Sequence, residues 1–388
     1  MRALSLLPVL WLLYTSNAFV PQEAMRSRLA SLAPPLRASA ENDATAVETP
    51  QVNAAPWTWR GHSIHTETCG TRGGQPVLLV HGFGCSTFYW RATAVALANA
   101  GCDVHAVDLL GQGRSAKPTD VTISINLWAA MVDDYARERM SGERNQEAAD
   151  IGDIIFGQKE DRIVLMGNSL GSLVALAAAL GDHADEGFEP YLASGSDRVA
   201  GICMYNCGVG LNSRGIANEA QWNFLQRFLI KAVLNTLDAI LFDNPPVLRY
   251  VLREVVTPEL LRGALEGLYR SNPTRVDDAL VMSFYNPAKD EGAPEALRQI
   301  YTNDPGLSPM ELHDKYAEQV KEVPIHLVWG DDDGVTPLSG GVGAFYSKLA
   351  AKDETLVSMK VVEGTGHIPF DDAHVESNES MLAWLSKL

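Results

Sequence analysis

The sequence predicts an α/β fold in which a mostly parallel central sheet is flanked by helices and carries an inserted helical cap. Short apolar runs alternate with helix-forming stretches along most of the chain. A strand, a sharp turn and a helix follow one another at 162–180. The alternation stops at 207–323, where helical patterns take over. We therefore expect a core in two parts, 56–206 and 324–388, with the cap at 207–323 between them.

The expected elements follow from local pattern. The segment 57–68 suits an opening hairpin, and short apolar runs predict buried strands at 76–80, 103–107, 162–165, 199–205, 325–329 and 356–362. Helical periodicity predicts core helices at 88–100, 127–140 and 173–180, and cap helices at 219–242, 246–255, 258–269 and 274–284. Two segments, 141–161 and 181–196, fall outside this rhythm and are interpreted as insertions.

The turn at 166–171 reads Met-Gly-Asn-Ser-Leu-Gly and places Ser169 between a predicted strand and a predicted helix. This is the G-x-S-x-G spacing, in which two glycines relieve crowding around a strained serine. The serine hydroxyl then projects from the edge of the sheet toward a substrate. The pattern predicts that Ser169 is a nucleophile.

Three further motifs each follow a predicted strand: His81-Gly82-Phe83-Gly84, the three aspartates at 331–333, and His367. A neutral serine hydroxyl is a poor nucleophile, so we expect His367 to take its proton and an aspartate to orient the imidazole. The residues alone leave Asp331, Asp332 and Asp333 as candidates for that acid.

The chain order of serine, acid and histidine resembles that of the α/β-hydrolase fold. The resemblance favours Asp333 as the acid. Trp329, Gly330 and Pro337 stand in register with the family pattern W-G-x-x-D-x-x-x-P, whereas Asp331 and Asp332 do not fit that pattern.

The same resemblance implies a catalytic triad of Ser169, Asp333 and His367. It also implies an oxyanion hole formed by the backbone N–H groups of Phe83 and Leu170. Epoxide hydrolases and haloalkane dehalogenases of this fold have an aspartate at the position of Ser169 in the turn 166–171, which we call the elbow. A serine at this position therefore argues against both activities.

Other polar residues are interpreted as structural. His81 and Asp108 stand where the resembling family organises its loops. The remaining histidines show no metal-ligand spacing, so they predict no metal site. Ester hydrolysis by a serine needs no organic cofactor, and we expect none.

Composition sets broad limits. The 388 residues are 46% hydrophobic, which is enough for one large α/β domain with a cap. The formal net charge of -17 argues against a nucleic-acid partner, because phosphate binding needs clustered Lys and Arg. The five cysteines form an odd set without a C-x-x-C pair, which indicates reduced thiols.

The amino terminus predicts targeting. A charged start, a short apolar run and small residues up to Ala18 predict a signal peptide at 1–18, and basic, Ser- and Ala-containing 19–40 predicts a transit peptide. The acidic, Ala-rich segment 41–55 is expected to be a disordered linker. Two signals in series with Phe19 at the junction resemble the bipartite presequence of algae with secondary red plastids. The implied location is the plastid, and secretion is the alternative.

A closer resemblance rests on 77–84, Trp90-Arg91, 108–115, 167–172 and Asn206. Together these resemble the plastid pheophytinase, chlorophyll dephytylase and chlorophyllase group. The resemblance implies cleavage of the phytyl ester of chlorophyll-type pigments, which releases phytol and a chlorophyllide or pheophorbide.

Several alternatives stay open. Lipases, galactolipases, thioesterases and carotenoid-ester hydrolases share the serine, and an inactive pigment- or lipid-binding protein is a different class. The expected cap helix at 219–242 is apolar over a wide arc, which indicates core packing or a pocket for a hydrocarbon. The expected partners are therefore an apolar ester, a chlorophyll-type pigment among them, and the thylakoid membrane surface. The sequence leaves the oligomeric state open.

Overall fold

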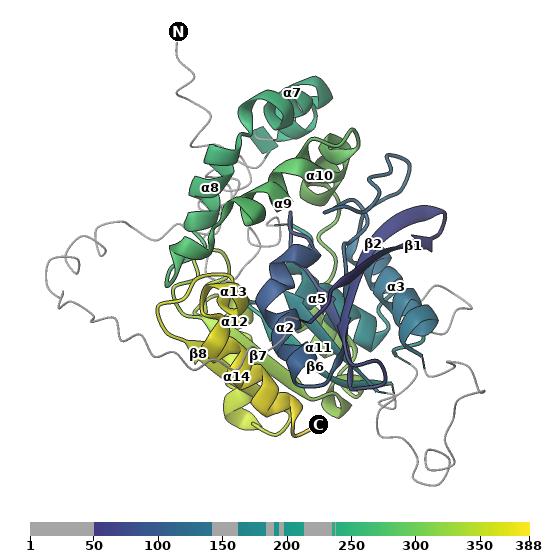
Figure 1. The fold of residues 1–388 in the computed structure, drawn as a ribbon, viewed down its shortest axis with the longest axis vertical. Helices are drawn as coiled ribbons and strands as arrows, with labels where there is room; N and C mark the ends of the chain where they lie inside the picture. The colour runs from purple at the N-terminus through teal and green to yellow at the C-terminus, as the bar shows by residue number, and fades with distance from the viewer. Residues whose placement is uncertain (1–49, 142–161, 184–189, 194–197, 213–234, 237) are drawn as a thin grey trace, which may run out of the picture.

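The computed structural model describes residues 50–141, 162–183, 190–193, 198–212, 235–236 and 238–388 (Figure 1). Its centre is an eight-stranded sheet in the order β1-β2-β4-β3-β5-β6-β7-β8. β2 runs antiparallel to β1 and β4, and the other neighbouring pairs are parallel, so the predicted mostly parallel sheet is confirmed. The strands are β1 Asn53–Trp59, β2 His62–Gly70, β3 Pro76–Val80, β4 Asp103–Val107, β5 Ile163–Asn168, β6 Val199–Tyr205, β7 Ile325–Gly330 and β8 Val357–Val362.

Helices cover both faces of this sheet (Figure 1). Alternate residues of β3 show why, because Leu78 and Val80 belong to one hydrophobic cluster while Val77 and Leu79 belong to another. The core helices are η2 Thr87–Trp90, α2 Arg91–Asn99, α3 Ile125–Tyr135 with its continuation η3 Ala136–Met140, α5 Leu170–Leu180, α12 Gly341–Lys352, α13 Pro369–Asp372 and α14 His374–Leu385.

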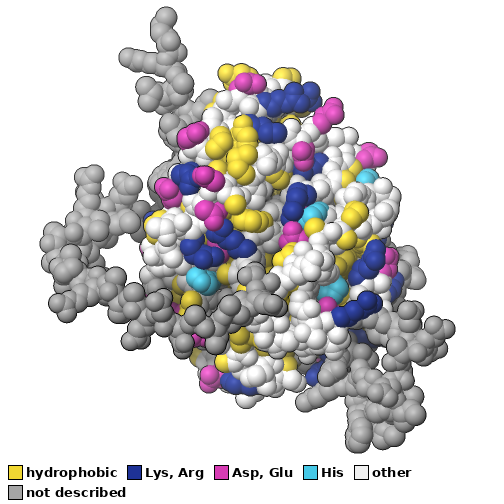
Figure 2. Space-filling view, in the orientation of Figure 1, with side chains coloured by type: hydrophobic (Ala, Val, Ile, Leu, Met, Phe, Trp, Pro, Cys, Tyr) yellow, Lys and Arg dark blue, Asp and Glu magenta, His cyan; other side chains and the backbone are white. Residues whose placement is uncertain are grey.

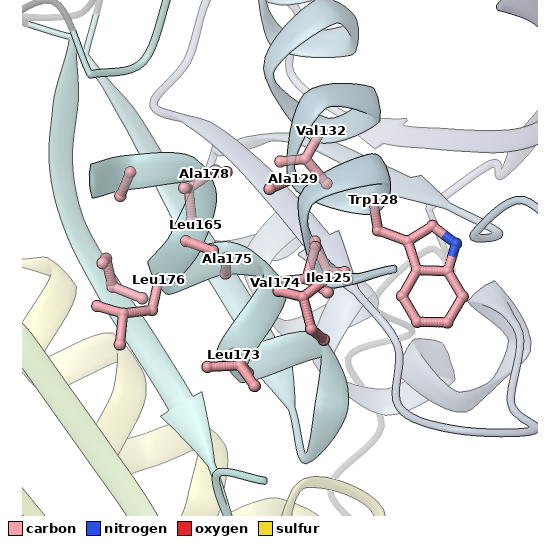
Figure 3. Packing of buried hydrophobic residues seen from close by; sticks show 14 of the residues in the cluster. Ile125, Trp128, Ala129, Val132, Leu165, Leu173, Val174, Ala175, Leu176 and Ala178 are labelled. Carbon is pink, nitrogen blue, oxygen red and sulfur yellow. The ribbon is translucent and has the colours of Figure 1, made fainter. Parts of the chain in front are cut away.

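The helix after the elbow is enclosed on all sides. Every residue of α5 is buried, and α3 packs against it with Ile125, Ala129 and Val132 (Figure 3). A helix apolar around its whole circumference is expected to lie in a protein interior. The indole Nε1 of Trp128 donates to the carbonyl of Leu110 at 2.9 Å, so burial of this ring leaves no unpaired donor.

Most of the described residues between β6 and β7 form the expected helical cap. Its elements are η6 Asp238–Phe242, α7 Pro245–Tyr250, η7 Val251–Val255, α8 Pro258–Glu266, η8 Pro273–Arg275, α9 Asp278–Ala288 and α10 Ala293–Thr302. The next elements, α11 Pro309–Lys315 and η9 Gln319–Glu322, pack on the core instead, where α11 contacts α5 and α12. A small apolar cluster that includes Phe242, Leu248 and Leu252 holds α7 and its neighbours together. No helix in the described ranges is long and apolar enough to cross a membrane.

Two expectations for the segment between β6 and β7 need correction. The helix expected at 274–284 is α9 and begins at Asp278, because Pro273 starts a separate turn and the side chain of Asp277 caps α9 through Leu280 N. Helices α10 and α11 were not expected at all. Most of the helix expected at 219–242, nearly all of the insertion at 141–161 and much of 181–196 lie outside the described residues.

Candidate active site

Ser169 occupies a strained turn between β5 and α5. Its φ is 52° and its ψ is -118°, a conformation that few side-chain-bearing residues adopt. Two neighbouring glycines permit the turn. A Cβ on Gly167 would lie 2.3 Å from the carbonyl oxygen of Gly171, and a Cβ on Gly171 would lie 2.2 Å from that of Val80. The Ser169 side chain stays partly exposed at this point, while Asn168 beside it is buried.

His367 and Asp333 meet at the end of the sheet. Nδ1 of His367 contacts Oδ2 of Asp333 at 2.8 Å. The same oxygen accepts from Asn206 Nδ2 at 2.5 Å and from Thr336 Oγ1 at 2.7 Å, and Oδ1 accepts from the backbone N–H of Val335 at 2.7 Å. Burial alone raises the pKa of Asp333, but the adjacent imidazole and these donors outweigh it and lower the pKa.

The other two aspartates face elsewhere. Asp331 accepts from the backbone N–H of Gly364 at 2.7 Å, and Asp332 lies 3.5 Å from Arg270 with a side chain that is 58% exposed. Of the three candidates, only Asp333 contacts His367 within the described part of the chain. With Nδ1–H directed to Asp333, Nε2 of the imidazole is the nitrogen left to act as a base.

A backbone contact ties the histidine loop to the elbow. Nδ2 of Asn168 donates to the carbonyl of His367 at 3.3 Å and to that of Tyr205 at 3.1 Å. The residue before the serine therefore holds the segment that carries the imidazole.

The loop after β3 lies against the elbow. A Cβ on Gly82 would lie 3.0 Å from Oδ1 of Asn168 and 3.3 Å from Cβ of Ser169, so a larger residue here would require its neighbours to shift. The side-chain oxygen of Gln112 accepts from the backbone N–H of Gly84 at 2.6 Å, which fixes the peptide next to Phe83. This arrangement brings Phe83 and Leu170, the two expected oxyanion donors, to the same cavity as Ser169.

The structural interpretations of His81 and Asp108 are confirmed. His81 is fully buried, and its Nε2 accepts from the backbone N–H of Leu109 at 3.0 Å. Asp108 accepts from the N–H of Thr87 at 2.6 Å and of Arg114 at 2.7 Å. Both side chains join neighbouring loops and leave the cavity to other residues.

The candidate site opens into a cavity of about 130 Å³. Ser169 and His367 share it with mainly apolar side chains, which are Phe83, Cys85, Tyr89, Leu170, Val209, Leu211, Leu268, Ile300, Tyr301, Val335 and Ile368. A second cavity of about 100 Å³ shares Phe83 and Ile300 with the first and is lined by Leu252, Phe284, Pro287, Ala293 and Leu297 from the cap. Both cavities are therefore bounded jointly by the core and the cap.

The five cysteines are all free and buried. Burial raises the pKa of Cys69 and of Cys102 to about 11, so these thiols stay protonated near neutral pH. Cys85 lines the first cavity, and burial raises its pKa as well. Within the described ranges, no group of three His, Cys, Asp or Glu side chains is placed to bind a metal ion.

Sequence reasoning missed three groups that shape the site. Thr336 contacts Asp333, and Gln112 contacts the loop that carries Phe83. Neither contact can be predicted from a local sequence pattern. The acidic pair Asp371 and Asp372 follows His367 closely and binds the cap. From the sequence, Asn206 is identified only as part of the family resemblance and is given no role. A polar residue directly after a buried strand is nevertheless a signal that could have identified it.

Comparisons with known proteins agree with this architecture. A model described as the alpha/beta hydrolase family matches residues 77–378. The acetyltransferase component of an acetoin-cleaving system from Pseudomonas putida is 26% identical over 82% of this chain and 65% of its own length. An epoxide hydrolase from Caballeronia sordidicola is 35% identical over 21% of this chain and 24% of its own length. The chain thus spans less than two thirds of these curated relatives.

Solved structures share the fold at low identity. The epoxide hydrolase CorEH superposes with a TM-score of 0.59 at 18% identity, over 87% of this chain and 99% of its own. A bacterial membrane phospholipase A superposes with a TM-score of 0.52 at 20% identity, over 87% of this chain and 86% of its own.

Proposed function

The chain belongs to the alpha/beta hydrolase family, and on this premise we propose that it is a serine hydrolase of apolar carboxylic esters. The observation that carries the proposal is a largely apolar cavity lined by Ser169, on its strained turn, and by His367, whose Nδ1 is hydrogen-bonded to the buried Asp333. A nucleophile, a base and an acid that orients the base are the groups that acyl transfer requires.

In the proposed reaction, Ser169 Oγ attacks the ester carbonyl while His367 Nε2 takes the hydroxyl proton. Asp333 remains ionised and stabilises the imidazolium. The N–H groups of Phe83 and Leu170 donate to the oxyanion. The imidazolium then protonates the departing alcohol, and a water molecule activated by His367 hydrolyses the acyl-enzyme and restores the serine.

The substrate proposed first is a chlorophyll-type pigment, cleaved at its phytyl ester to give phytol and a chlorophyllide or pheophorbide. Two adjoining apolar cavities around Phe83 and Ile300 support a substrate with a long hydrocarbon on at least one side of the ester. The pigment itself rests on the sequence resemblance.

A lipid ester is the second candidate. The fold shared with a membrane phospholipase A supports it, as do exposed apolar side chains on the cap, where Ile240 is 61% and Tyr250 is 60% exposed. Figure 2 shows basic side chains beside apolar ones near the top of the molecule, over the cap. This surface, with Arg249 and Arg253, is where we propose contact with a membrane such as the thylakoid.

The plastid location remains part of the proposal. It rests on the presequence expected at 1–40, which lies outside the described residues. The disordered linker expected at 41–55 is wrong for residues 53–55, which begin β1 because they pair with 66–68 of β2.

The test uses the full chain and its Ser169→Ala variant with chlorophyll a, pheophytin a, a galactolipid and a p-nitrophenyl ester. Phytol or fatty acid release is followed by chromatography, and a fluorophosphonate probe reports serine reactivity. We expect hydrolysis and labelling by the parent, and a loss of at least about 10³-fold in kcat for the variant.

The outcomes separate the candidates. Phytol release supports the pigment ester, and fatty acid release alone moves the substrate to lipids. Labelling at Ser169 without hydrolysis of any ester contradicts the proposed substrates. A parent that neither hydrolyses nor labels contradicts the enzyme proposal and favours a binding protein.

A further inference from the structure

The loop that carries His367 touches the cap through its backbone. A Cβ on Gly366 would lie 2.1 Å from the carbonyl oxygen of Leu268, so the two main chains are in direct contact. Leu268 belongs to the stretch between α8 and α9, and it lines the same cavity as His367 and Ile368. A cap residue in the wall of the cavity therefore contacts the residue that precedes His367.

Asp372 joins the same two segments. Its Oδ2 accepts from the backbone N–H of Gly366 at 3.3 Å, of Arg270 at 2.9 Å and of Ser271 at 3.1 Å, and its Oδ1 accepts from that of Asn272 at 2.6 Å. The residue is 2% exposed. A buried carboxylate that accepts several N–H groups holds them in one fixed arrangement, because each lost bond leaves an unsatisfied charge.

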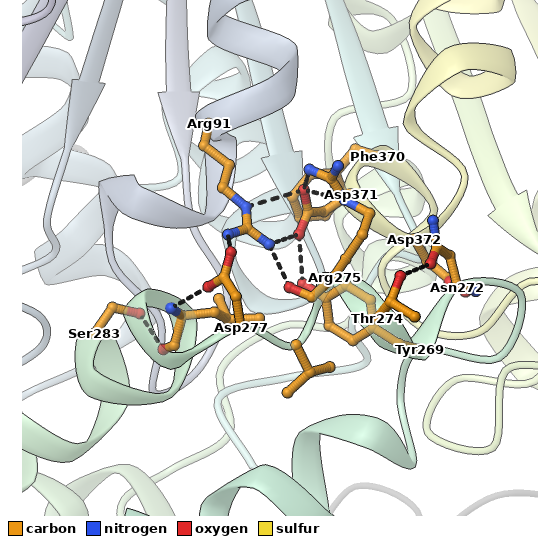
Figure 4. A network of polar contacts seen from close by, with 12 residues as sticks. Arg91, Tyr269, Asn272, Thr274, Arg275, Asp277, Ser283, Phe370, Asp371 and Asp372 are labelled. Carbon is orange, nitrogen blue, oxygen red and sulfur yellow. Dashed lines mark hydrogen bonds and ion pairs between the residues drawn. The ribbon is translucent and has the colours of Figure 1, made fainter. Parts of the chain in front are cut away.

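Asp371 extends the connection to the core (Figure 4). It is fully buried and accepts from Arg91 Nη2 on α2 at 2.9 Å, from Arg275 Nε in η8 at 3.0 Å and from the hydroxyl of Tyr269 at 2.7 Å. Arg91 also pairs with Asp277 of the cap at 2.6 Å. The guanidinium groups of Arg91 and Arg275 thus provide two positive charges for the carboxylates of Asp371 and Asp277.

We infer that Asp371 and Asp372 are positioning residues that fasten cap residues 268–277 to the histidine loop, so that the placement of the cap determines the placement of the His367 imidazole. This inference rests on the proposed function. It adds that residues 268–277 of the cap are held in place against the core. It also adds that the position of the His367 imidazole depends on two residues that contact neither the substrate nor the imidazole.

The test compares Asp372→Asn with Asp133→Asn. Asp133 is a matched control, because it is also fully buried and accepts from two backbone N–H groups, those of Tyr191 and Leu192, but lies on α3 away from the cavity. Both variants are expected to lose stability. Activity is measured on p-nitrophenyl acetate and p-nitrophenyl octanoate across pH, and hydrogen exchange is followed at the amides of 270–272.

We expect Asp372→Asn to lower kcat for both esters by at least about tenfold and to move the acidic limb of the pH–rate profile by about half a unit or more, with faster exchange at 270–272. Asp133→Asn should keep kcat within about twofold and keep the profile. The milder Arg275→Gln removes one cap partner of Asp371 and leaves Arg91 and Tyr269. It is expected to change activity in the same direction by about two- to fivefold, so the inference stays testable if Asp372→Asn does not fold.

Faster exchange in Asp372→Asn or Arg275→Gln with an unchanged kcat and pH profile shows that the contact only holds the cap, and overturns the inference while leaving the proposed function intact. A parent protein that releases no nitrophenol contradicts the proposed function, and the inference fails with it.

Discussion

The side-chain amide of Asn206 donates to Oδ2 of Asp333 at 2.5 Å, the same oxygen that His367 contacts at 2.8 Å. Its own oxygen accepts from the backbone N–H of Gly330 at 3.1 Å. Asn206 has a φ of 43°, which asparagine and glycine tolerate better than other residues do. Asn206, which directly follows β6, thus connects the carboxylate of Asp333 to the end of β7.

Asn206→Gly retains this backbone conformation and removes the amide. A hydrogen bond to a charged group contributes about 1.5–3 kcal/mol, so we expect kcat to fall by about ten- to a hundredfold. Urea denaturation should show a lower free energy of unfolding. An unchanged kcat contradicts a role for this amide in holding Asp333.

Asp333→Asn is expected to reduce kcat by about 10⁴-fold, because an amide at this position favours the wrong tautomer of His367. The matched control is Asp332→Asn, which alters an exposed neighbour and should keep kcat within about twofold. The assay is ester hydrolysis at saturating substrate. A large loss in the control with little loss in Asp333→Asn reverses the assignment of the acid.

Gln112→Leu removes the acceptor for the Gly84 N–H and frees the loop that carries Phe83. We expect kcat to fall by about tenfold with little change in KM, because an oxyanion donor acts mainly in the transition state. Gln112→Glu keeps an acceptor oxygen and should be less impaired than the leucine variant. Equal rates in both variants indicate that the Gly84 contact does not support the oxyanion hole.

We expect the stability of the fold to decrease in acid because of the buried carboxylate of Asp133. Burial raises its pKa, but His183 and the N–H groups of Leu192 and Tyr191 outweigh this, so the pKa in the folded state lies below its ordinary value. Such a group stabilises the fold fully above the unfolded-state pKa and loses that contribution as the pH falls through the folded-state value. The free energy of unfolding should therefore decrease below about pH 4.

Urea denaturation between neutral pH and pH 3 measures this dependence. Asp133→Asn should be less stable at neutral pH and should show a shallower decrease on acidification. A decrease as steep as that of the parent assigns the acid sensitivity to other carboxylates.

Local pattern was sufficient for the sheet and for the elbow. β3, β5, β6 and β7 are apolar runs buried on both faces, and such runs stand out in a sequence. The serine turn is equally visible, because Gly167 and Gly171 are required at fixed offsets. The proposed triad roles of Ser169, Asp333 and His367 follow from the order of the motifs along the chain.

Contacts between distant segments could not be predicted in this way. Asp371 binds Arg91 across 280 positions of sequence, and Gln112 reaches Gly84 from another loop. Neither pattern has a period or a local spacing. In the cap, the start of α9 was displaced by the turn at Pro273. Helix α10 does carry a local signal that sequence reasoning missed, because it is amphipathic and has Pro294 and Glu295 in its first turn.

The strand order has a consequence for the time at which this protein becomes active during its synthesis. The centre of the sheet, with β3 between β4 and β5, comes from the first half of the chain, and the elbow serine is therefore made early. The proposed acid and base follow β7 and β8, which are synthesised after the other six strands of the described sheet and add one edge to it. A nascent chain that ends before β7 carries the proposed nucleophile without the proposed acid and base. We therefore expect hydrolysis to begin only when residues 325–388 have docked on the sheet, and a chain that lacks them to be inactive.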